Sequence, residues 1–160
     1  DTSTLDISVT PVDDPFTDGN EAITIAEDSG ASTGSLLVGT SSVDGPVTVT
    51  QFVVNGTTYT VPVGGSTTAT LAAGTLVIGA NGSYSFTPAA NWNGTVPQVT
   101  YTLTDGSSTD TSTLDISVTP VDDPFTDANE AITIAEDSGA TTGSLLTGTS
   151  SVDGPVAHVT

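Results

Sequence analysis

Hydrophobic and polar residues alternate along most of the chain with a period of two, which is typical of strands that bury one face. In the opening segment 3–10, Leu5, Ile7 and Val9 fall on one face and polar residues on the other. No segment shows the period of an amphipathic helix. The pattern predicts short strands at 3–10, 22–26, 35–38, 47–54, 57–63, 67–71, 75–78, 83–87, 98–104 and 112–119.

Turn-forming pairs separate these segments. Asn55-Gly56 is a strong hairpin signal because both residues tolerate a positive φ, and further Gly-containing pairs mark other turns. Residues 27–30 interrupt the first strand of the complete unit before it resumes at 35–38. Eight or nine short strands at this spacing predict an all-β protein, an antiparallel Greek-key β-sandwich of the immunoglobulin type.

The chain contains an internal repeat. Residues 1–47 match residues 110–156 at 44 of 47 positions, which gives a period of 109 residues. This period is too long for a solenoid and indicates tandem repeats in which each unit is a domain. The predicted organisation is the last strand of a preceding repeat at 1–12, a linker at 13–17, one complete repeat at 18–121, a second linker at 122–126 and the N-terminal part of a following repeat at 127–160.

The two partial repeats lack most of a core. The chain begins within the pattern and has no Met, so we expect it to be a piece of a longer protein whose neighbouring repeats are partners of this one. A pair of strands is marginally stable alone. We therefore expect strand contacts between molecules, either from the leading strand of one chain to the trailing fragment of another or through a strand swap.

The charge is one-sided and unevenly placed. Nineteen acidic residues and no Lys or Arg give a net charge of −19, which excludes nucleic acid as a partner and disfavours an anionic membrane surface. No stretch is apolar enough for membrane insertion. Residues 51–104 contain no acid, and all acids except Asp105 lie in 1–50 and 110–160. The charge is therefore concentrated where repeats meet.

One acidic segment occurs twice, at 11–21 and 120–130. Each copy holds three Asp and one Glu between two strands, and its two prolines stiffen the backbone. Neighbouring carboxylates repel by about 1 kcal/mol even in water, so folded segments of this kind require a cation. Carboxylate, amide and carbonyl oxygens are hard ligands that favour Ca²⁺. The alternative is a solvated acidic linker that only keeps domains apart.

Three segments resemble a known family: Gly82-Ser-Tyr-Ser-Phe-Thr-Pro-Ala-Ala-Asn-Trp-Asn-Gly94, Tyr101-Thr-Leu-Thr-Asp-Gly106 and Val118-Thr-Pro-Val-Asp-Asp-Pro124. Together they are similar to the cadherin-like and VCBS-type repeats of large bacterial surface proteins, close to the extender repeats of RTX adhesins. The resemblance implies an immunoglobulin-like spacer that is exported to the extracellular bacterial surface and binds Ca²⁺ at each joint. Many such repeats end in Pro-Val-Asn-Asp-Ala-Pro, whereas this chain has a more acidic variant.

The topology of such a sandwich distributes the acids between two joints. The first strand runs away from the preceding joint, while the loop that holds Asp105 returns to it. The first joint is then expected to gather Asp13, Asp14, Asp18, Asn20, Glu21 and Asp105. The second is expected to gather Glu27, Asp28, Asp122, Asp123, Asp127, Asn129 and Glu130. Four further acids, on outer strand faces or in Asp-Gly turns, are assigned no ligand role: Asp6, Asp44, Asp115 and Asp153.

The chain lacks the residues of a catalytic site. There is no Cys, the only histidine is His158, and the acids lie in linkers rather than beside an aromatic cleft. Trp92, flanked by two Asn, is expected to pack a loop rather than to bind sugar. We therefore expect a non-catalytic spacer that calcium makes rigid. The alternative is a binding module whose loops recognise a glycan or a protein.

Overall fold

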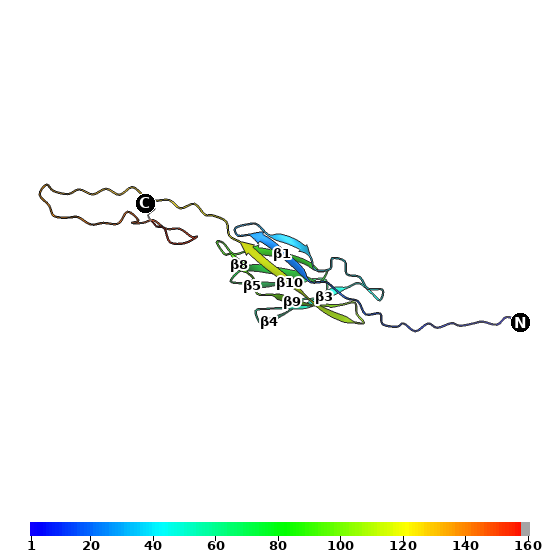
Figure 1. The fold of residues 1–160 in the computed structure, drawn as a ribbon. Helices are drawn as coiled ribbons and strands as arrows, with labels where there is room; N and C mark the ends of the chain where they lie inside the picture. The colour runs from blue at the N-terminus through cyan, green and yellow to red at the C-terminus, as the bar shows by residue number, and fades with distance from the viewer. Residues whose placement is uncertain (158–160) are drawn as a thin grey trace.

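The computed structural model describes residues 1–157, which form one β-sandwich, an extended leading segment and a trailing segment that turns back on itself outside the sandwich (Figure 1). No helix is present among these residues. The larger sheet has the order β1-β10-β9-β3-β4, and β8 pairs with β10. Its strands are β1 (Glu21–Ala26), β3 (Thr48–Val54), β4 (Thr57–Thr60), β8 (Gly94–Thr95), β9 (Val99–Thr104) and β10 (Thr109–Thr119).

The second sheet has four strands in the order β2-β7-β6-β5. They are β2 (Ser32–Ser35), β5 (Ser66–Leu71), β6 (Gly74–Gly79) and β7 (Ser83–Pro88). The two sheets confirm the predicted all-β, immunoglobulin-like sandwich. The hairpin between β3 and β4 turns at Asn55 and Gly56, whose φ values of 50° and 74° are both positive, as that turn requires.

One strand pair departs from the predicted antiparallel arrangement. β1 pairs with β10 in parallel, with Ile23 opposite Ile116 and Ala26 opposite Thr119, whereas the other pairs in the described chain are antiparallel. Parallel strands need a long connection, and here the rest of the domain provides it. The consequence is that β1 and β10 end at the same pole of the sandwich.

The core lies between the two sheets and follows the alternation of the sequence. Every second residue of β9, and of β10 from Ser112 to Val118, is buried, which confirms the predicted inward orientation of Val99, Tyr101 and Leu103. Facing residues from β3, β6 and β7 complete this core. The largest of its fully buried side chains are Tyr101, Phe52, Phe86, Leu36, Leu76, Ile78, Leu103, Leu114 and Ile116.

Two strand predictions are wrong in extent. The strand predicted at 35–38 lies at 32–35, and the apolar pattern there marks the burial of Leu36 rather than strand structure. A Cβ on Gly34 would meet the ring of Tyr84, so the absence of a side chain lets β2 lie close to that ring. The strand predicted at 57–63 ends at Thr60, shortly before Pro62, which has no N–H to donate to a neighbouring strand.

The segments outside the domain show how far pairing decides secondary structure. Residues 3–10 are not a strand in this structure, although the identical residues 112–119 form most of β10. Ile7 is 77% exposed, whereas Ile116, its counterpart, is 1% exposed. Residues 131–157 likewise contain no strand. The leading segment stays extended because no neighbouring strand completes its hydrogen bonds. His158 lies outside the described residues.

The first linker is docked onto the complete domain. Phe16, which lies in the predicted linker 13–17, is 8% exposed and belongs to the core. Its repeat counterpart Phe125 is 51% exposed because the domain that would bury it is incomplete. The sandwich therefore holds the linker that precedes it through an aromatic side chain.

Replacement of Phe16 by Ala tests this anchoring. A buried Phe-to-Ala change costs about 3 kcal/mol or more through lost contacts and a cavity, so we expect a loss of that size for Phe16→Ala in denaturant unfolding. The matched control is Phe125→Ala, which should leave the free energy of unfolding unchanged. Equal effects of the two variants would contradict the anchoring of the first linker.

Candidate metal centres at the two joints

Most of the predicted ligands lie at the two poles of the sandwich or in the linkers next to them, whereas Asp127, Asn129 and Glu130 lie farther along the trailing segment. We call the end that receives linker 13–17 the N-terminal pole and the end from which the chain leaves after β10 the C-terminal pole. No three His, Cys, Asp or Glu side chains within residues 1–157 are already arranged to hold a metal ion. The positions and partners of individual carboxylates therefore decide what each pole can bind.

At the N-terminal pole, Asp18 and Glu21 surround the buried hydroxyl of Tyr101. That hydroxyl lies 2.8 Å from Asp18 Oδ2 and also contacts Glu21 Oε2. The Thr40 hydroxyl contacts Asp18 Oδ1, and the Asp18 N–H donates to Asp110 Oδ2 at 2.7 Å. The carboxylates of Asp18 and Glu21 therefore accept hydrogen bonds from hydroxyl groups at the edge of the core.

Burial and charge affect this group together. Burial raises the pKa of Glu21, the hydrogen bond from Tyr101 opposes that rise, and the negative charge of Asp18 adds to it. Burial likewise raises the pKa of Tyr101, and its two carboxylate partners raise it further. The hydroxyl therefore stays protonated and acts as a donor to the two acids.

The remaining predicted residues of this pole lie in different surroundings. Asn20 accepts a hydrogen bond from the Thr113 N–H at 3.0 Å, so its side chain fastens the residues between the linker and β1 to β10. Asp13 and Asp14 are exposed. The Asp14 N–H donates to Asp44 Oδ2 at 2.7 Å, which ties the linker to the loop before β3.

Asp105 is buried beside that same loop. The Ser42 hydroxyl donates to Asp105 Oδ2 at 2.6 Å, and the N–H groups of Ser107 and Ser108 donate to Oδ1 at 2.9 and 2.8 Å. A Cβ on Gly45 would lie 2.8 Å from the Asp105 carbonyl oxygen, so glycine permits this close approach. Asp105 is thus held at the pole that linker 13–17 enters.

At the C-terminal pole, Glu27 closes the end of the parallel pair. Its N–H donates to the Thr119 carbonyl at 2.9 Å, and its Oε1 accepts from the Val121 N–H at 2.7 Å. Its Oε2 accepts a hydrogen bond from Asn93 Nδ2 at 3.0 Å. Glu27 is only 3% exposed. Glu27 therefore fixes the direction in which the chain leaves the domain.

Asp28 lies next to Glu27 in a left-handed turn with φ of 57°. Its Oδ1 accepts a hydrogen bond from the Asn91 N–H at 2.9 Å. Asn91 and Asn93 flank Trp92, which packs against the core as expected. The loop around Trp92 thus supports the two acids of this pole.

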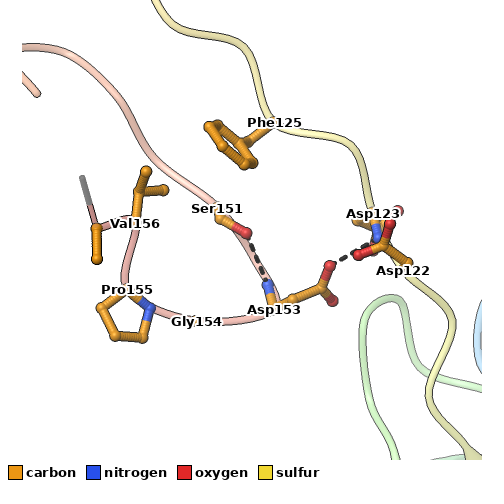
Figure 2. Close-up of a pocket in the computed structure, with 9 residues that line it drawn as sticks. Asp122, Asp123, Phe125, Ser151, Asp153, Gly154, Pro155 and Val156 are labelled. Atoms are coloured by element: carbon orange, nitrogen blue, oxygen red, sulfur yellow. Dashed lines mark hydrogen bonds between the residues drawn. The ribbon is translucent and has the colours of Figure 1, made fainter. Parts of the chain in front are cut away.

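Asp123 is the centre of the charge at this pole. Its pKa is raised first by burial and then by the negative charges of four neighbours: Asp28, Asp153, Glu27 and Asp122. Its N–H donates to Asp153 Oδ2 at 2.7 Å (Figure 2). Its Oδ2 is buried and has no hydrogen-bond partner. A buried carboxylate oxygen without a partner is costly, and four negative neighbours add to that cost.

The other predicted residues of the second joint are not brought into this cluster. Asp127 contacts the Thr149 hydroxyl, and Asn129 and Glu130 are exposed. The Asp127 contact repeats the one between Asp18 and Thr40 at a distance of 109 residues along the chain. It therefore belongs to the local structure of the following repeat.

Sequence reasoning missed Asp44 and Asp153, which it assigned to Asp-Gly turns. In both repeats this residue accepts a hydrogen bond from the linker N–H thirty residues earlier, at 2.7 Å. Each of them lies 30 residues after the second Asp of its linker. This spacing, which both copies of the repeat share, is the signal that could have found them. Each joint thus includes an acid from the repeat that follows it.

A hollow of about 350 Å³ lies against the second joint. Its lining includes Asp122, Asp123, Asp153 and the exposed ring of Phe125 (Figure 2). The oxygen donors fit a hard divalent cation such as calcium.

The chain is an immunoglobulin-like repeat module. Its defining features are the sandwich of two sheets, the parallel pairing of β1 with β10 and the acidic poles. A family model described as a cadherin-like domain matches residues 12–119, and the chain belongs to this family. No curated protein matches the chain. The matched residues begin one residue before the linker that Phe16 anchors and end with β10. None of the described residues forms a helix that is long and apolar enough to cross a membrane.

The hydrogen bonds of Asp105 make a prediction for acid stability. The Ser42 hydroxyl, followed by the Ser108 and Ser107 N–H groups, lowers the pKa of Asp105 from 3.8 to about 2. A depressed pKa stabilises the fold above the unfolded-state value, and this contribution is lost as pH falls through the folded-state value. We expect the stability difference between the unchanged chain and Asp105→Asn to shrink between about pH 4 and pH 2.

Denaturant unfolding at a series of pH values measures this difference. Asp6→Asn is the matched control because it removes the same charge from the exposed leading segment, and its profile should follow that of the unchanged chain. A constant gap between the unchanged chain and Asp105→Asn over this pH range would refute the role given to the three donors.

Proposed function

We propose that this chain is a non-catalytic spacer repeat of a large bacterial surface adhesin of the RTX type, and that calcium at the joints makes consecutive repeats rigid. The observation that carries the proposal is the buried, unpartnered Asp123 Oδ2 among four other carboxylates at the C-terminal pole. Such a repeat would act outside the cell, where calcium is abundant, and would hold distal adhesive domains away from the surface.

The residues that would hold calcium come from both sides of the joint. The preceding domain supplies Glu27 and Asp28, the linker supplies Asp122 and Asp123, and the following repeat supplies Asp153. By the repeat of 109 residues, Asp13, Asp14 and Asp44 take the corresponding places at the first joint, beside Asp105. A divalent cation would neutralise these charges and crosslink groups that otherwise repel.

The protein contacts at the joint support a spacer rather than a loose tether. Glu27 fixes the backbone at Val121 on one side of the joint. On the other side, Phe16 of the first joint shows how a complete following domain buries the linker. Only a few residues around each Asp-Asp pair are left without such contacts, so a few metal bonds would be enough to fix the angle between domains.

Calcium titration tests the site directly. Extracellular calcium modules bind with Kd values of about 10⁻⁴ to 10⁻³ M, and a ligand at ten times its Kd stabilises the folded state by about 1.4 kcal/mol. We expect isothermal titration calorimetry to detect binding in this range. The double change Asp28→Asn with Asp123→Asn should weaken binding at least tenfold.

The control for this titration is Asp115→Asn, which removes a charge from an outward position on β10, where Asp115 accepts a hydrogen bond from Gln98. It should leave calcium binding unchanged. Equal weakening by the control and by the double variant would indicate general charge attraction rather than a site.

Rigidity requires a separate measurement on several tandem complete repeats. Small-angle scattering should give a longer maximum dimension in calcium than in chelator, because fixed joints prevent the repeats from folding back on one another. An unchanged maximum dimension, with calcium shown to be bound, would contradict the spacer mechanism.

A further inference from the structure

The chain carries the same core strand twice. Residues 1–10 are identical to residues 110–119, which form all of β10 except its first residue. In β10 the inward residues are Leu114, Ile116 and Val118, with exposures of 0%, 1% and 3%. In the leading segment the same three side chains are 83%, 77% and 86% exposed. One copy thus fills a place in the sandwich, and the other copy has none.

Apart from the pairing of Thr109 with Thr104, the place that β10 fills depends on residues that the leading segment also has. Residues 110–114 pair with β9, and residues 114–119 pair in parallel with β1. An identical strand in the same register would reproduce the pairing of residues 110–119 and bury the same side chains. The two arrangements therefore differ little in their contacts within the sandwich.

The match continues beyond the strand into the joint. Residues 11–14 are identical to 120–123, so the Val12 N–H can donate to Glu27 of another molecule as the Val121 N–H does within one chain. The segment that follows is already docked onto a complete domain, where Phe16 is 8% exposed. By contrast, the chain's own trailing segment leaves Phe125 51% exposed. A strand from a second molecule would therefore bring a complete following domain to the joint.

We propose that a second copy of this chain is a binding partner, through exchange of this strand: residues 1–10 of one molecule replace β10 of another. The two complete domains then stand head to tail across one full joint. That joint combines Glu27 and Asp28 of the acceptor with Asp13, Asp14 and Asp44 of the donor. The strand contacts do not depend on the proposed calcium function, whereas added stability in calcium does.

The exchange has a kinetic barrier. β10 lies between β9 and β1, so it must leave the sheet before another strand can enter, which requires at least partial unfolding. Two chains of charge −19 also repel each other, and salt screens that repulsion. Dimers should therefore form slowly in the cold, form readily after brief warming at high concentration and moderate salt, and persist on dilution.

Light scattering after size-exclusion chromatography measures the result. The full chain is warmed to its unfolding midpoint in chelator, cooled and separated, and species at multiples of 15.8 kDa are expected. Ile7→Asp should abolish them without changing the unfolding of the monomer, since Ile7 is exposed there. Thr2→Asp adds the same charge at the counterpart of Thr111, which is exposed in β10, and should preserve them.

A third variant separates this exchange from simple pairing with the trailing segment. Ile132→Asp should leave the dimer unchanged, because residues 130–135 take no part in the exchanged sandwich. Loss of the dimer in Ile132→Asp, or a purely monomeric unchanged chain after warming, would overturn the exchange. A dimer that forms in chelator and gains no stability from calcium would uphold the exchange and count against the calcium joint.

Discussion

One constraint governs the joints of this molecule: the fold brings carboxylates together, and these carboxylates repel one another. The parallel register of β1 and β10 places Ala26 opposite Thr119, so the acids that follow β1 meet the acidic linker that follows β10. No Lys or Arg exists to balance them. The sandwich thus gathers negative charge at one pole that no Lys or Arg of the chain balances.

The repeat shows that the same sequence takes different structures according to what surrounds it. Phe16 and Phe125 stand in identical linker sequences, yet only Phe16 has a complete domain to bury it. The leading segment and β10 differ in the same way. In contrast, the hydrogen bond between the linker N–H and the Asp of the following loop is present in both copies, so this part of each joint forms without a completed core.

Much of the fold was accessible from the sequence because alternation and turn residues act locally. Strand positions, the Asn55-Gly56 hairpin and the inward face of β9 follow from such signals. The parallel partner of β1 did not, because pairing between the first and last strands is a property of the whole domain. The extent of β2 was also missed, since a buried Leu36 just outside a strand gives the same apolar pattern as one inside it.

Some residues of the candidate sites could likewise be assigned from the sequence, and others could not. Glu27, Asp28 and Asp123 could be assigned to one joint because topology fixes where strands end. The hydrogen bonds from the Tyr101 hydroxyl to Asp18 and Glu21 could not be predicted, because they depend on which hydroxyl the core buries near the linker. Asp153 was overlooked because an Asp-Gly pair indicates a turn equally well without a metal.

Diffraction from crystals of the chain grown with calcium, with anomalous scattering used to locate the ion, tests the central claim most directly. The predicted result is a calcium ion at the C-terminal pole, with Asp123 Oδ2 and at least two of its neighbouring carboxylates about 2.3 to 2.6 Å from it. A C-terminal pole without an anomalous peak, with Asp123 turned toward solvent, would contradict the calcium-bound joint.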